Sequence, residues 1–202
     1  KIIPTFDKPP REGGKFEGAY VGEPQRGFQD YIVSFDVNSL YPNVMISLNL
    51  SPETKMGSFE EQSDGRVLLT KVKGKPNVLT KENLYKGVKE ANLAVSRAQV
   101  LFSQNTKGVY PQIVDNFYKE RVVIKKEQFK LKKQLSEIDK NDTKLVAELE
   151  DKINKLDIKQ FTIKIFINTV YGYFGNKHSP MGDTDISRSI TLTGRAVIKQ
   201  SN

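Results

Sequence analysis

The chain has 202 residues, enough for one or two domains, and its 32 Lys and Arg residues exceed its 24 Asp and Glu residues to give a net charge of +8. Cysteine is absent and His178 is the only histidine, which excludes disulfides, thiolate metal sites and histidine-rich zinc sites. The positive charge favours a polyanionic partner such as nucleic acid, and any metal would need oxygen ligands, which suit Mg²⁺, Mn²⁺ or Ca²⁺.

The amino-terminal part is predicted to combine coil, two strands and one short helix. Residues 1–15 are rich in proline, glycine and charge, so we expect an extended lead-in. Residues 16–21 and 31–37 are predicted strands, because both are apolar runs beside a turn-rich segment. Asp36, near the end of the second run, could cap a turn, or its carboxylate could hold a divalent cation. A helix is predicted over residues 44–50.

Short apolar runs at residues 67–69, 78–79 and 98–102 fit either strands or short helices. Two long helices are then predicted between Pro111 and about residue 173, because apolar residues recur there at spacings of three, four or seven. A short polar segment separates them and offers three candidate N-caps: Asn141, Asp142 and Thr143. So short a loop predicts antiparallel packing, and the fold class is α+β.

The first long helix carries a strongly basic segment. Residues 119–133 contain seven Lys and Arg residues and only two Glu residues. Arg121 and Lys125 are four positions apart, so they share one face of the helix. Most such pairs are simply solvated, but an arginine fork beside a lysine suits a polyphosphate. The single sign of the charge favours the second interpretation.

The second long helix carries a polar stripe. Lys164, Asn168 and Tyr171 follow the spacing i, i+4, i+7 and therefore lie along one side of an otherwise apolar helix. Tyr171 alone would fit a core and Asn168 alone would merely weaken the helix. Together they indicate a binding site.

These motifs resemble DNA polymerases of family B. Residues 36–43, Asp-Val-Asn-Ser-Leu-Tyr-Pro-Asn, resemble the first palm motif, Asp-x-x-Ser-Leu-Tyr-Pro-Ser, with asparagine in place of the last serine. Residues 164–172 match the second motif, Lys-x-x-x-Asn-x-x-Tyr-Gly, and Arg121 and Lys125 resemble the fingers-helix pair. Residues 49–54, Asn-Leu-Ser-Pro-Glu-Thr, look most like T4-type bacteriophage replicative polymerases.

The resemblance implies a role for each residue of the first motif. Asp36 would bind both catalytic metal ions, Mg²⁺ or Mn²⁺, and the backbone carbonyl of Val37 would bind one of them. The backbone of Ser39 and Leu40 would cradle the triphosphate of the incoming nucleotide. Tyr41 would be the steric gate that excludes a ribose 2′-hydroxyl, which argues against an RNA-synthesising enzyme.

The resemblance also implies roles on the two helices. Arg121 and Lys125 would grip the triphosphate, and Asn168 would help to position it. Lys164 would contact the phosphates and assist pyrophosphate departure, as a catalytic residue. Residues that would line the template or the nascent base pair are Gly18, Tyr20, Tyr171 and Gly172.

Residues 182–185, Gly-Asp-Thr-Asp, are similar to the hairpin that supplies the family's second metal-binding carboxylate. We expect them instead to form a loop that enters a helix, with Asp185 or Ser187 as the N-cap. They follow the Lys-Asn-Tyr-Gly motif too closely for that hairpin, and no apolar runs flank them. His178 is assigned no role.

The implied organisation after the lead-in is a partial palm sheet over residues 16–110, an antiparallel two-helix fingers hairpin over 111–175, and a truncated return into the palm over 176–202. We therefore expect a fragment of an intracellular DNA polymerase, in the host cytoplasm if of phage origin, that is inactive alone. The longer parent would extend a primer 3′-OH by two-metal phosphoryl transfer.

The implied partners are primer–template DNA and dNTPs, with a sliding clamp and a single-strand-binding protein as candidates. The alternative is a non-catalytic nucleic-acid-binding module built on the basic helical hairpin.

Overall fold

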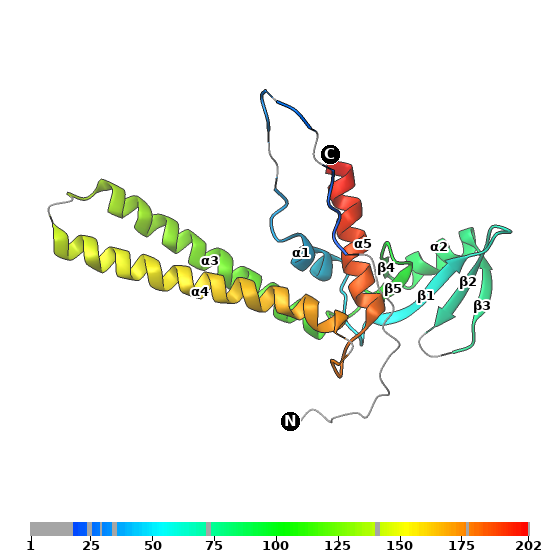
Figure 1. Cartoon of the computed structure of the whole chain (residues 1–202). Coiled ribbons are helices and arrows are strands. Elements are labelled where there is room, and N and C mark those ends of the chain that lie inside the picture. Colours follow the sequence, from blue (N-terminus) through cyan, green and yellow to red (C-terminus); the bar gives the residue numbers. More distant parts are fainter. Residues whose placement is uncertain are drawn as a thin grey trace.

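The computed structural model describes residues 18–23, 26–28, 30–33, 36–71, 74–139, 142–176 and 178–201. A long pair of helices extends to one side, and a small sheet covered by one helix lies on the other (Figure 1). Two shorter helices stand where these parts meet. The α+β class predicted from the sequence is confirmed. None of the described helices has both the length and the apolar character that a membrane-spanning segment requires.

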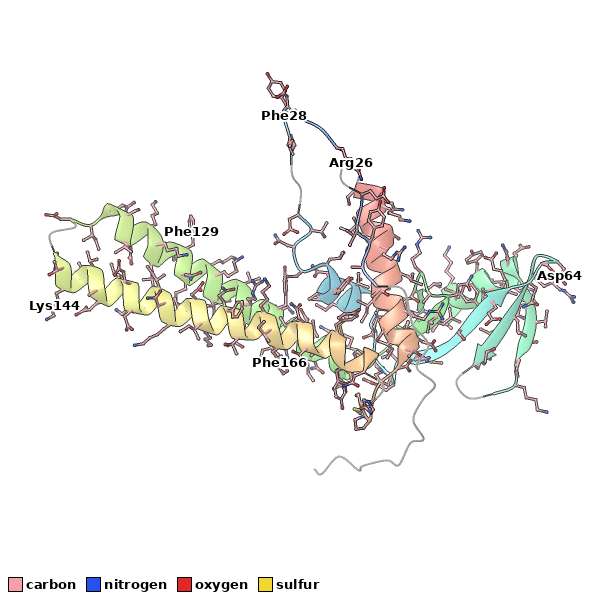
Figure 2. All side chains as sticks on the ribbon, in the orientation of Figure 1. Arg26, Phe28, Asp64, Phe129, Lys144 and Phe166 are labelled. Carbon is pink, nitrogen blue, oxygen red and sulfur yellow. The ribbon has the colours of Figure 1, made fainter. Side chains whose placement is uncertain are left out.

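The segment before the first helix corrects the sequence-based prediction. None of residues 18–21, 31–33 and 36–37 forms a strand; the rest of both predicted strands, like the lead-in over residues 1–15, lies outside the described residues. Phe28 and Tyr31 are fully exposed, and Phe28 lies at the far end of a loop that stands away from the body of the molecule (Figure 2). A strand needs a hydrogen-bonding neighbour, and the described strands pair only with one another.

The first helix, α1 (Leu40–Ser47), begins earlier and ends earlier than predicted. Pro42 fits its first turn, where a missing backbone N–H costs nothing. Ser39 precedes the helix with a left-handed φ of 52°, and Asn49 terminates it with a φ of 55°. Residues other than glycine seldom adopt this left-handed conformation, so the surrounding structure must hold both residues in place.

The described strands form one antiparallel sheet in the order β3-β2-β1-β5-β4. They are β1 (Lys55–Glu61), β2 (Arg66–Lys71), β3 (Asn77–Thr80), β4 (Leu93–Val95) and β5 (Val100–Ser103). Helix α2 (Lys81–Glu90) follows β3. The apolar runs at residues 67–69 and 78–79 therefore lie in strands, and so do residues 100–102 of the third run, whereas Ala98 and Gln99 lie in the turn before β5. Burial alternates along β2, and β5 is buried in the main core.

The two long helices are confirmed as α3 (Val109–Glu137) and α4 (Thr143–Gly175), which pack against each other as a hairpin. Asp142 caps α4 by accepting a hydrogen bond from the backbone N–H of Leu145, 3.2 Å away. Across the pair, the Gln128 amide donates to the Asp157 carboxylate at 2.9 Å. A final helix, α5 (Thr184–Ser201), turns back past α1 (Figure 1).

The main core joins α1, β5, α3, α4 and α5 through buried residues such as Met45, Phe102 and Phe174. A second, smaller core lies between α2 and the sheet. Because α1 is packed against three helices, the turn that precedes it is held against the hairpin and α5. This junction positions the candidate site.

A buried asparagine ties the start of α3 to the end of α1. The Asn49 amide donates to the backbone carbonyls of Ser103 at 2.6 Å and Thr106 at 2.8 Å, and its carbonyl oxygen accepts from the Gly108 N–H at 2.8 Å. The Glu53 carboxylate accepts from the Val109 N–H at 2.6 Å. The base of the helical hairpin is therefore fixed to residues 49–54, the segment that follows α1.

Candidate functional site

A groove of about 640 Å³ lies between the turn before α1 and the basic side of α3. Ser39 contributes from the turn, and Arg121 and Lys125 contribute from α3. The whole lining is Asn38, Ser39, Tyr118, Arg121, Val122, Lys125, Lys126, Phe129 and Lys130. The structure thus brings the predicted basic pair next to the predicted phosphate-binding turn.

The charge of this basic pair is not neutralised within the chain. Among the described residues, neither Arg121 nor Lys125 takes part in an ion pair, whereas Lys119 on the same helix binds Asp115 at 3.0 Å. The Nε of Arg121 is buried and has no hydrogen-bond partner in the described part of the chain. A buried donor without an acceptor is costly, so the arrangement favours an anion in the groove.

The polar stripe of α4 faces the same junction. Lys164 and Asn168 are exposed, and Tyr171 is half-buried against Tyr41, with ring centroids 4.9 Å apart and an interplanar angle of 50°. Burial raises the pKa of the Tyr41 phenol; burial first and then the neighbouring Tyr41 raise the pKa of Tyr171. Both rings therefore stay uncharged at neutral pH.

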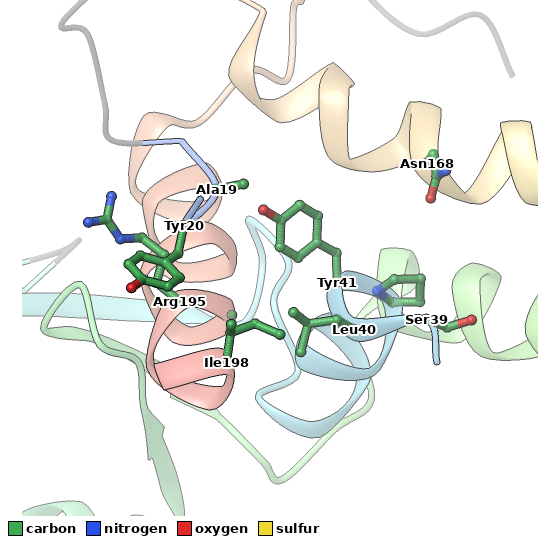
Figure 3. A pocket seen from close by; sticks show the side chains of 10 residues that line it. Ala19, Tyr20, Ser39, Leu40, Tyr41, Asn168, Arg195 and Ile198 are labelled. Atoms are coloured by element: carbon green, nitrogen blue, oxygen red, sulfur yellow. The ribbon is translucent and has the colours of Figure 1, made fainter. Parts of the chain in front are cut away.

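A second hollow, of about 340 Å³, lies next to the same turn (Figure 3). Its lining comes from coil, α1, α4 and α5: Ala19, Tyr20, Ser39, Leu40, Tyr41, Pro42, Asn168, Gly194, Arg195 and Ile198. In Figure 3 the Tyr41 side chain stands between α5 and the Asn168 side of the hollow. Ser39 lines both hollows.

Lys164, Gly172 and Gly18 line neither hollow, whereas Tyr20 lines the second. Lys164 and Gly172 are on α4, Gly172 has open space around it, and Gly18 is in exposed coil beside Tyr20. Tyr20 lies under the Lys199 ammonium, 5.2 Å from the ring centroid, which anchors this coil to α5.

Asp36 and Val37 lie in exposed coil immediately before α1. The hard oxygen donors that they offer fit a divalent cation in kind. In the part of the chain that the structure describes, however, no three His, Cys, Asp or Glu side chains gather as a metal-binding group. These residues therefore supply one carboxylate and do not complete a two-ion site.

The segment Gly182–Asp185 is a loop that enters α5, as expected. The N-cap prediction was wrong: the helix starts at Thr184, and Asp183 accepts the backbone N–H of Asp185 at 3.0 Å. The Lys55 ammonium binds both carboxylates, Asp183 at 3.0 Å and Asp185 at 2.6 Å. Their charge is therefore used to join β1 to α5.

Sequence reasoning missed several residues of the two hollows. Lys126 and Lys130 belong to the basic segment of residues 119–133, so the density of positive charge is the signal that indicates them. Phe129, which is 70% exposed among lysines and projects from α3 (Figure 2), breaks the apolar period and was a readable signal. Gly194 and Arg195 gave no signal, because only tertiary packing brings α5 to Tyr41.

Comparisons with known proteins identify the family. All of residues 1–202 match the model of DNA polymerase family B. DNA polymerase 1 of Pyrococcus abyssi is 30% identical over 185 residues, which cover 91% of this chain and 18% of that protein. DNA polymerase beta of African swine fever virus (isolate Tick/Malawi/Lil 20-1/1983) is 27% identical over 201 residues, 96% of this chain and 16% of that protein.

A solved structure supports the fold. The family B DNA polymerase from Pyrobaculum calidifontis matches with a TM-score of 0.54 and 21% identity, over 96% of this chain and 20% of that one. The chain thus spans about a fifth or less of the length of each of these three proteins. Because the family model covers every residue, the chain belongs to DNA polymerase family B.

Proposed function

We propose that this chain is the nucleotide-holding part of a template-directed DNA polymerase, with dNTPs and primer–template DNA as substrates. The observation that carries the proposal is the groove in which Arg121 and Lys125 face the Ser39 turn. An arginine fork and a lysine point charge beside this turn form a good receptor for a triphosphate. Family membership supplies the polymerase context.

Each element contributes one function in this proposal. The α3 pair binds the triphosphate, and Lys164 and Asn168 approach it from α4, with Lys164 favouring departure of pyrophosphate. The Tyr41 ring occupies the place of a ribose 2′-hydroxyl, so deoxyribose is preferred. Tyr171 and Gly172 border the new base pair, and Gly18 and Tyr20 border the template. The segments 16–110, 111–175 and 176–202 act as palm, fingers and returning palm.

Asp36 and the carbonyl of Val37 would hold one side of a divalent-ion site, for Mg²⁺ or Mn²⁺. Such ions, when bound, stabilise the attacking and leaving oxygens in phosphoryl transfer. The remaining ligands would come from a longer parent chain, which would act inside the cell together with a sliding clamp and a single-strand-binding protein. The T4-type subtype rests on residues 49–54 alone and stays a prediction.

A titration of the chain with dNTP and Mg²⁺ tests the proposal. Lys164→Ala should weaken triphosphate binding about tenfold, because one hydrogen bond to a charged group is lost. Lys152→Ala removes the same charge from an exposed position of the same helix, twelve residues away, and should leave affinity nearly unchanged.

Equal losses in the two variants would support the alternative, a basic hairpin that attracts polyanions without a defined site. That alternative accounts for the charge of α3. It gives no reason for the packing of Tyr41 on Tyr171.

A further inference from the structure

The Tyr41 ring is confined on two sides by different helices. Tyr171 of α4 packs against it with ring centroids 4.9 Å apart. On the α5 side it meets the backbone of Gly194, a buried residue in the middle of that helix. A tyrosine ring is rigid and turns about only two side-chain bonds, so contacts on both sides fix where it stands.

Gly194 has no local reason to be glycine. It lies inside a helix, where glycine is less favourable than alanine, and its backbone does not adopt a positive φ. A Cβ added there would stand 2.9 Å from Cε1 and 3.3 Å from Cδ1 of Tyr41, and 3.4 Å from Cδ2 of Leu40. The missing side chain is therefore the space that the Tyr41 ring fills.

We propose that Gly194 is a positioning residue for Tyr41 and sets how far the ring reaches toward the sugar of the incoming nucleotide. This inference rests on the proposed function of Tyr41. A methyl group at position 194 pushes the ring away from α5. The ring also lines the hollow that reaches Asn168, and in the proposed function this is the side on which the sugar would bind.

The test uses a full-length polymerase that contains this chain, assayed by single-nucleotide primer extension. Gly194→Ala should raise the KM for dNTP about tenfold with a smaller change in kcat, because a small displacement of a substrate-contacting group weakens positioning. Ribonucleotides should be used no better than before. In a Tyr41→Ala background the same substitution should have no effect on KM, because the ring that it displaces is gone.

Gly87→Ala is the matched control. Gly87 lies inside α2, and a Cβ there would meet nothing within 4 Å. Gly87→Ala changes helix propensity as Gly194→Ala does, yet it should leave the KM for dNTP unchanged. Thermal unfolding of every variant shows whether the substitution impairs folding. If Gly194→Ala impairs folding, Tyr41→Ala should restore it by making room for the methyl group.

The inference is wrong if Gly194→Ala leaves the KM for dNTP unchanged, or if its effect is the same with and without the Tyr41 ring. It is also wrong if the double variant fails to fold, since α5 would then need glycine for another reason. Failure of the proposed function looks different: the unaltered full-length protein would not extend a primer with dNTPs at all.

Discussion

At the scale of single residues, the contact between the Tyr41 and Tyr171 rings is central to the proposed function. Their contact joins the first motif to the stripe on α4, two features that are more than a hundred residues apart in the sequence. In a full-length polymerase, Tyr41→Ala should raise the use of ribonucleotides relative to dNTPs by about tenfold to a hundredfold, because the steric barrier to a 2′-hydroxyl is removed. Primer extension with each nucleotide measures the ratio.

The control for that experiment is Tyr85→Ala, which removes an exposed tyrosine from α2. Its nucleotide ratio should equal that of the unaltered enzyme. An unchanged ratio in Tyr41→Ala would show that this ring does not face the sugar.

Asp115 gives a prediction for pH. The ammonium groups of Lys107 and Lys119 bind its carboxylate and lower its pKa below the usual value. A depressed pKa in the folded state stabilises the protein above the unfolded-state pKa of about 3.9, and this stabilisation disappears as pH falls through the folded-state pKa.

The free energy of unfolding should therefore fall more steeply between about pH 5 and pH 2 in the unaltered chain than in Asp115→Asn. Urea titrations at several pH values measure this slope. Parallel pH profiles for the two proteins would contradict the assigned ion pairs.

At the scale of elements, the turn after α1 holds the base of the helical hairpin through Asn49. Asn49→Gly keeps the left-handed backbone but deletes all three side-chain hydrogen bonds, so we expect a loss of about 2–4 kcal/mol in the free energy of unfolding. Asn92 has a similar φ of 51° and is exposed. Asn92→Gly should therefore lower the free energy of unfolding by only a few tenths of the loss expected for Asn49→Gly. Equal costs in denaturant titrations would show that the buried hydrogen bonds contribute little.

The long helices could be predicted from the sequence because their apolar period and the Asp142 cap are local signals. Apolar runs indicated β2, β3 and β5 as strands or short helices, but β1 and β4 were not predicted, and the strand order could not be, since pairing joins distant residues. Residues 31–33 and 36–37 form no strand, although their composition favours one, because a strand exists only where a partner is present. The contact of Gly194 with Tyr41 could not be predicted for the same reason: it is set by packing between α1 and α5.

At the scale of the whole molecule, the proposed nucleotide site combines a turn and two helices, and Asp36 is the one carboxylate of the described residues that the proposal places at a metal ion. Lys55 binds Asp183 and Asp185, so these two acids are engaged in joining the sheet to α5. Residues 1–202 alone should therefore show no primer extension above background with dNTPs and Mg²⁺. Extension that Asp183→Asn abolishes would overturn this assignment and make the two acids metal ligands.

The most direct test of the central claim is a titration of the isotopically labelled chain with dNTP and Mg²⁺, followed by amide chemical shifts. If the proposed site binds the nucleotide, the shifts should concentrate at Ser39–Tyr41, at Arg121 and Lys125, and at Lys164 and Asn168, with little change in α2 and the sheet. Shifts spread evenly over all lysine-rich surfaces, or confined to the sheet, would contradict a nucleotide site between α1, α3 and α4.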